Sequence, residues 1–130
     1  MAKILKSIIV LFILLASNLV DAKMRVSVTN MLDHNLDLTI HCKSKDDDLG
    51  EHLIHHLQRY EFAFGETFFG TTQFFCGFQW KGAFKWFDIY IEKRDACYSG
   101  RCNWKIKQHQ ACMHDGDSEI EICYPYNKVG

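Results

Sequence analysis

The stretch Asn35-Leu36-Asp37-Leu38-Thr39-Ile40-His41-Cys42-Lys43 alternates between polar and apolar side chains at every position. Alternation with period two is typical of a β-strand that is buried on one face and exposed on the other. Outward along the chain, the same pattern recurs in Arg25–Asn30, Tyr60–Gly65, Thr72–Trp80, Cys102–Ile106 and Ile120–Tyr124. Phe84–Ile91 is apolar on both faces, as we expect of a central strand.

Short turn signals separate these stretches, at Asp47–Gly50, Phe64–Glu66, Lys81-Gly82, Ser99-Gly100 and Asp115–Asp117. Asp115-Gly116, between two alternating stretches, predicts a tight hairpin. Leu53, Ile54 and Leu57 have helical spacing, but the segment is too short to carry a helix, so we expect strand or turn there. About seven or eight short strands with regular turns predict an all-β fold, an antiparallel β-sandwich or barrel.

Residues 1–22 have the pattern of a secretory signal peptide. Lys3 and Lys6 form a positive start, Ser7–Ala16 is an apolar run, and Val20 and Ala22 stand where a signal peptidase expects small residues. The apolar run is shorter than the roughly 20 residues that a membrane span needs. We therefore predict a cleaved leader and a single secreted, extracellular domain over residues 23–130, with no membrane insertion. The alternatives are an uncleaved anchor or a buried N-terminal helix.

The charge balance disfavours two classes of function. Removal of Lys3, Lys6 and Asp21 with the leader leaves 13 basic and 15 acidic residues, a net charge of −2 with histidine neutral. Nucleic-acid binders and membrane-lytic peptides usually carry a positive excess that meets phosphate. We therefore expect no nucleic-acid partner.

Six cysteines, an even number, lie in the predicted mature domain: Cys42, Cys76, Cys97, Cys102, Cys112 and Cys123. In a small secreted domain this indicates a disulfide framework, whose pairing the sequence does not determine. A two-residue turn at Asp115-Gly116 would set Cys112 and Cys123 about 13 Å out of register, beyond disulfide reach. That pair therefore requires a longer loop or a tail that folds back. The absence of a CxxC pair argues against zinc.

Other polar clusters favour ordinary surface roles. Glu51-His52-Leu53-Ile54-His55-His56 is not the HExxH motif, and three consecutive aspartates at Asp46–Asp48 do not supply the alternating ligands of a calcium loop. No nucleophile elbow or phosphate-binding glycine loop is present in the sequence, so we expect no enzymatic activity and no cofactor or metal. A histidine-based hydrolase such as a nuclease is an alternative. The many aromatic rings could form a sugar-binding platform, but we expect most of them in the core.

The run His41–Gly50 (HCKSKDDDLG) resembles the signature of the plant self-incompatibility protein family, the S-protein homologues. Other parts of the chain are similar to the family in the same order: Val26–Asn30, Phe68–Cys76, Trp80, Phe87, Tyr90, Cys97, Cys102 and Trp104. The resemblance implies a secreted plant protein with a β-sandwich core and no enzymatic activity. Four cysteines match the family pattern, and Cys112 and Cys123 look like an additional pair.

Founding members of that family are stigma-secreted ligands for a receptor on incompatible pollen, and they arrest pollen-tube growth. The resemblance therefore implies a disulfide-braced β-sandwich that acts as a ligand for a cell-surface receptor protein. A defence or developmental signal of the same family is the alternative. Polar segments between strands are the candidate partner-binding residues: Lys45, Asp46, Asp47, Asp48 and Glu51 in Lys45–Glu51, Glu92, Lys93 and Arg94, and His114, Asp115 and Asp117 in His114–Ser118.

Overall fold

A computed structural model describes residues 6–10, 23–65, 72–92, 94–95, 97, 100–114 and 120–127. Nine strands lie within these residues. Their bounds are β1 Met24–Asn30, β2 Leu38–Lys43, β3 Asp48–Ile54, β4 Arg59–Phe64, β5 Gln73–Trp80, β6 Ala83–Ile91, β7 Arg101–Ile106, β8 Gln110–His114 and β9 Glu121–Pro125.

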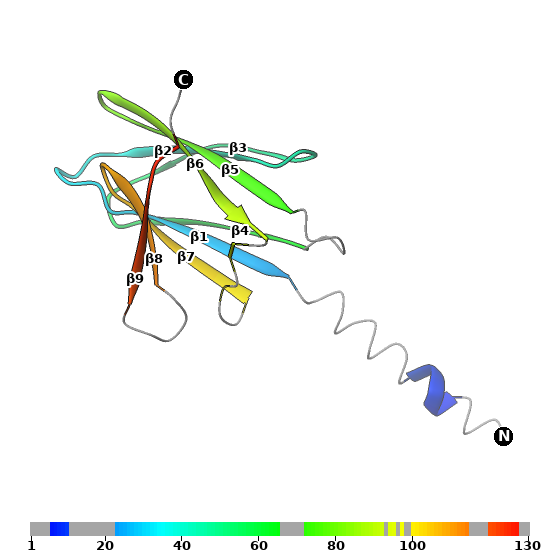
Figure 1. Ribbon diagram of the computed structural model, residues 1–130. Coiled ribbons are helices and arrows are strands. Elements are labelled where there is room, and N and C mark those ends of the chain that lie inside the picture. The colour runs from blue at the N-terminus through cyan, green and yellow to red at the C-terminus, as the bar shows by residue number, and fades with distance from the viewer. Residues whose placement is uncertain are drawn as a thin grey trace.

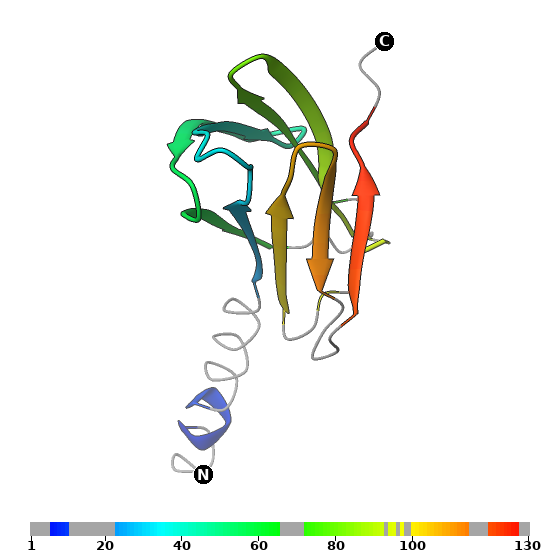
Figure 2. The same ribbon diagram turned by 90° about the vertical axis from the view of Figure 1, so that its left-hand side faces the viewer.

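The strands form two sheets that pack face to face (Figure 1). One sheet has five strands in the order β4-β1-β7-β8-β9, and the other has four in the order β3-β2-β5-β6. Figure 2 shows β7, β8 and β9 side by side, each antiparallel to its neighbour. The all-β sandwich predicted from the sequence is confirmed. Within it, β1 and β7 run parallel, because β7 enters the sheet after a crossover from the other layer.

The core lies between the sheets and is built from the side chains that point inward at every second position of the alternating strands. Leu38, Ile40 and Cys42 of β2 and Phe74, Cys76, Phe78 and Trp80 of β5 are all buried, as the period-two pattern predicts. Trp104 is fully buried and meets the edge of the Phe87 ring, with the ring centroids 5.1 Å apart. Most of the aromatic rings therefore serve the core.

The expectation of a central strand at Phe84–Ile91 is wrong. The corresponding strand, β6, forms one edge of the four-stranded sheet. Its outward-facing rings are not covered by another layer, and Phe84 is 58% exposed. The C-terminal residues protect part of this edge, because the Asn127 backbone N–H donates to Trp86 O (3.0 Å) and the Asn127 side chain accepts from the Asp88 N–H (3.0 Å).

Three disulfides brace the sandwich, and all six cysteines are paired: Cys42–Cys76, Cys97–Cys102 and Cys112–Cys123. Cys42 and Cys76 are direct neighbours on β2 and β5. Cys112 and Cys123 also lie directly opposite each other, because β8 ends at His114 and β9 begins only at Glu121. The predicted two-residue hairpin at Asp115-Gly116 is therefore wrong, and the longer loop is what brings this pair together.

Several predictions fall outside the described residues. These are most of the leader with the boundary at Ala22, the Phe68–Thr71 part of the resemblance, the turn signal at Ser99, and Asp115–Ser118. Within the leader, residues 6–10 are helical. No helix among the described residues is long and apolar enough to cross a membrane.

Candidate functional site

The three polar segments proposed as partner-binding residues begin where β2, β6 and β8 end in the sequence. β2, β6 and β8 all run toward one end of the sandwich, and β3, β7 and β9 run away from it (Figure 1). The fold thus brings the strand ends Lys43, Ile91 and His114, which are far apart in the sequence, to the same end of the sandwich.

The acidic segment is a turn followed by a strand. Ser44 N donates to Asp47 O (2.8 Å) and Asp47 N to Ser44 Oγ (3.1 Å), so the turn covers Ser44–Asp47 and leaves Lys45 and Asp46 exposed at its tip. The predicted turn over Asp47–Gly50 is displaced, because Asp48–Glu51 already belong to β3.

Asp48 is tied to the neighbouring strand. Its Oδ1 lies 2.5 Å from His41 Nε2 and accepts from Gly50 N at 2.9 Å, and its Oδ2 is 3.8 Å from Lys43 Nζ. The Gly50 N–H bond and the His41 contact hold the pKa of the Asp48 carboxyl below its usual value. At neutral pH, Asp48 is therefore an ionised side chain in a fixed position, whereas Lys45 and Asp46 project freely.

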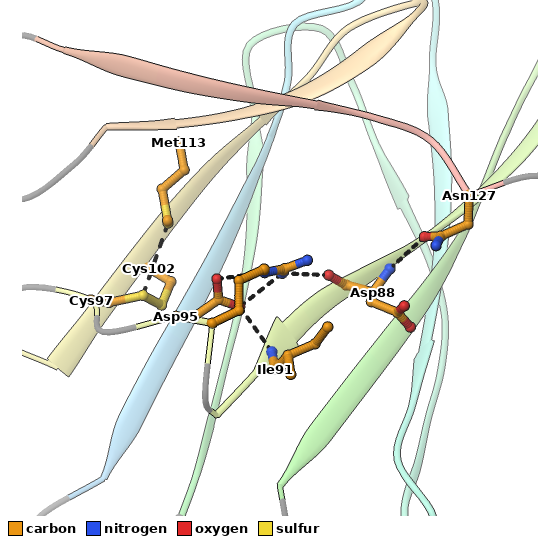
Figure 3. Close-up of polar contacts among 8 residues, drawn as sticks. Asp88, Ile91, Asp95, Cys97, Cys102, Met113 and Asn127 are labelled. Atoms are coloured by element: carbon orange, nitrogen blue, oxygen red, sulfur yellow. Dashed lines mark hydrogen bonds and ion pairs between the residues drawn. A yellow bond between two sulfur atoms is a disulfide. The ribbon is translucent and has the colours of Figure 1, made fainter.

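The second polar segment, Glu92–Arg94, does not lie wholly on the surface. Arg94 turns inward: its Nε donates to Asp95 Oδ1 (2.8 Å) and its Nη2 to Asp88 O (2.6 Å). The guanidinium also lies 5.2–5.5 Å from the ring centroids of Phe87, Trp104 and Tyr124. Asp95 accepts a further bond from Ile91 N (Figure 3). Arg94 therefore holds the two sheets together, Glu92 is half-buried, and Lys93 lies outside the described residues.

The third segment is described only at its borders. His114 is exposed at the end of β8, whereas Asp115 and Asp117 lie outside the described residues. The clearest partner-binding candidates in the described part of this end are thus Lys45, Asp46, Asp47 and His114.

The histidine side chains of the histidine-rich segment Glu51–His56 do not converge on one site. His52 stacks on Tyr60 with the centroids 4.3 Å apart and has Nε2 2.8 Å from Leu49 O, whereas His55 Nδ1 lies 2.8 Å from Asp37 Oδ1. Among the described residues, the one group of potential metal ligands that converge is Cys112, Glu121 and Cys123. Both of its thiols are consumed by a disulfide.

A second feature, which the sequence analysis missed, is a groove on the outer face of the four-stranded sheet. It has a volume of about 690 Å³. We call it the outer-face groove and define it by Phe75, Gly77, Phe84 and Trp86, with His41 and Asp88 at its borders. One signal could have revealed it: Phe75 is out of phase with the buried residues of its own strand.

Comparisons with known proteins place the chain. A family profile described as "Plant self-incompatibility protein S1" matches residues 25–126. The chain is 46% identical over 109 residues to S-protein homolog 29 of Arabidopsis thaliana, covering 82% of this chain and 79% of that protein. It is 42% identical over 113 residues to S-protein homolog 2 of the same plant (82% and 70%), and 34% identical over 126 residues to S-protein homolog 18 (95% and 92%). Because the profile covers most of the chain and these relatives are 34–46% identical to it, the chain belongs to the plant self-incompatibility protein S1 family.

Proposed function

We propose that this protein is a secreted ligand that binds a cell-surface receptor protein, and that in the stigma such binding arrests pollen-tube growth. The observation that carries the proposal is the family match over residues 25–126. The binding surface we assign is the polar end of the sandwich, with the exposed tip Lys45–Asp47 and His114 as its described members.

The structure supports this assignment through rigidity and charge. The turn is closed by two hydrogen bonds and stands beside the Cys42–Cys76 disulfide, so little conformational entropy is lost when a partner binds. Its exposed residues carry both signs of charge, which favours discrimination between partners by electrostatic complementarity. Export of the protein would supply the oxidising environment in which three disulfides persist.

The test is an exchange of charge that leaves the net charge unchanged. Lys45→Glu combined with Asp46→Lys reverses the charge pattern of the tip, where neither side chain has a partner in the described contacts. We expect at least a tenfold loss of binding of labelled protein to the pollen surface and loss of growth arrest in cultured pollen tubes.

The matched control makes the same exchange at the opposite end of the sandwich, with Asp33→Lys and Lys81→Glu. Both of these residues are exposed. The control should bind and arrest growth like the wild type. Equal binding by both variants would reject the polar end as the receptor surface. Wild-type protein that neither binds pollen nor affects its growth, together with transcripts absent from the stigma, would reject the pollen role.

A further inference from the structure

The outer-face groove is created by one glycine in a row that crosses all four strands. Glu51, His41, Gly77 and Trp86 are successive cross-strand neighbours on β3, β2, β5 and β6. Their side chains share the outer face of the sheet, and all four residues line the groove. Because Gly77 has no side chain, the row is lowest at β5, which leaves room for the Phe84 ring to lie over that position.

An aromatic ring is seated over this glycine. A Cβ built on Gly77 would lie 3.3 Å from Phe84 Cζ and 3.4 Å from Cε2, which is tighter than an ordinary contact. The Phe84 ring therefore rests against the sheet backbone at residue 77, while 58% of the residue remains exposed. Phe75 is 41% exposed and Trp86 is half-buried beside it. None of the ring contacts between described residues involves Phe75, Phe84 or Trp86.

The polar border of the groove is already ordered. Gln73 Nε2 donates to Asp88 Oδ1 at 3.0 Å, and Asp88 is itself anchored through its backbone N–H, which donates to the Asn127 side chain (Figure 3). Across the groove, His41 and Lys43 are both held by Asp48, at 2.5 and 3.8 Å. Side chains that are fixed before binding cost little entropy when they form hydrogen bonds to a ligand.

We propose that the outer-face groove binds a neutral saccharide chain. A sugar ring has an apolar C–H face that stacks on aromatic rings and a rim of hydroxyls that bond to amide, carboxylate and imidazole groups. The groove supplies both, with two exposed Phe rings and the half-buried Trp86 bordered by Gln, Thr, His, Lys and acidic side chains. Its volume of about 690 Å³ falls within the usual range of ligand sites. This inference does not depend on the receptor proposal.

Charge and shape argue against other occupants. The ionised groups that line the groove are Lys43, Glu51 and Asp88, a near-balanced set that gives an anionic ligand no advantage. An extended peptide would pair with a free strand edge, but the groove lies on a sheet face, and at the β6 edge Asn127 N already donates to Trp86 O.

The test uses the disulfide-bonded mature protein and neutral hexasaccharides of β-linked glucose, xylose or mannose, with hexagalacturonate as the charged probe. We expect at least one neutral probe to bind at a single site by calorimetry and to change the fluorescence of Trp86, since Trp80 and Trp104 are buried. Phe84→Ala and Trp86→Ala should each weaken binding about tenfold, the scale of one lost aromatic contact.

Two further variants separate binding from folding. Gly77→Ala should weaken binding several-fold by displacing the Phe84 ring, with no loss of thermal stability, because alanine is tolerated in a strand at least as well as glycine. Leu53→Ala removes another exposed apolar side chain of the same sheet, outside the groove, and should leave affinity within twofold of the wild type.

Several results would overturn the proposal. One is a folded wild-type protein that binds none of the neutral probes. Another is binding that is unchanged in Phe84→Ala and Trp86→Ala. Tighter binding of hexagalacturonate would assign the groove to an anion. Self-association in sedimentation that these same substitutions abolish would assign it to a second copy of the chain.

Discussion

Asn30 is a buried polar residue that joins two turns at the end of the sandwich opposite the acidic turn. Its Nδ2 donates to Leu36 O (2.8 Å) and Ile54 O (3.0 Å), and its Oδ1 accepts from Leu32 N (3.0 Å). The residue is 0% exposed. The two turns contain three non-glycine residues in the left-handed region, namely His34 (φ 65°), Asn35 (55°) and Leu57 (67°). Such conformations are unfavourable in isolation and persist where surrounding contacts hold them.

We expect Asn30→Ala to lower the free energy of unfolding by about 2–6 kcal/mol. The substitution leaves Ile54 O and Leu32 N buried without partners, at about 1–3 kcal/mol each, while water can reach the part-buried Leu36 O. At roughly 4 °C per kcal/mol for a domain of this size, the midpoint of thermal unfolding should fall by about 8–24 °C. Gln79→Ala, which removes an exposed side-chain amide, is the control and should cost under about 0.5 kcal/mol.

Asn30→Asp adds a pH dependence that a loss of packing would not produce. The carboxylate keeps the acceptor but faces two carbonyl oxygens, so burial should raise its folded-state pKa above the unfolded value of about 3.9. As the pH falls, the carboxylate of the Asn30→Asp variant is therefore protonated in the folded state before it is protonated in the unfolded state. The loss of stability should be largest at pH 7 and should shrink as the pH falls through the folded-state pKa. Urea unfolding at pH 7 and pH 5 measures this. A loss below 1 kcal/mol for Asn30→Ala would refute the reasoning.

Three further predictions concern the disulfides, Arg94 and acid stability. Replacing both cysteines of Cys42–Cys76 by alanine should destabilise the protein by about 1 kcal/mol more than the same change at Cys112–Cys123, as measured by urea unfolding. The reason is that the first disulfide closes a loop of 34 residues and the second a loop of 11 residues. An equal loss in both variants would contradict this loop-entropy argument. Arg94→Ala should cost about 3–5 kcal/mol because Asp95, whose side chain is 1% exposed, loses its charged partner, and adding Asp95→Asn should restore part of this loss. Because the pKa of Asp48 is lowered in the folded state, its contribution is present above its usual pKa of 3.8 and is lost as the pH falls through the folded value. Acid titrations should therefore show a shallower loss of stability for Asp48→Asn than for the wild type, and identical acid limbs would show that Asp48 contributes nothing.

The sequence predicts local structure well where alternation is strict. On β2 and β5 the side chains at every second position are buried, because a strand between another layer and solvent must carry its apolar residues on one side. The same rule failed at β6, since apolar residues on both faces are compatible either with a central strand or with an edge strand that leaves rings exposed on its outer face. Only the order of strands distinguishes the two cases.

By itself the sequence determined an all-β, disulfide-bonded class, because alternation, turn residues and cysteine number are read directly along the chain, while the resemblance of His41–Gly50 indicated the family. The tertiary structure alone decided the parallel pairing of β1 with β7, the register that sets Cys112 opposite Cys123, and the inward turn of Arg94. It also decided that Gly77, Phe84 and Trp86 meet in one groove. These features depend on contacts between residues distant in sequence, and a shift of one residue in the pairing of β8 with β9 would be enough to separate Cys112 from Cys123.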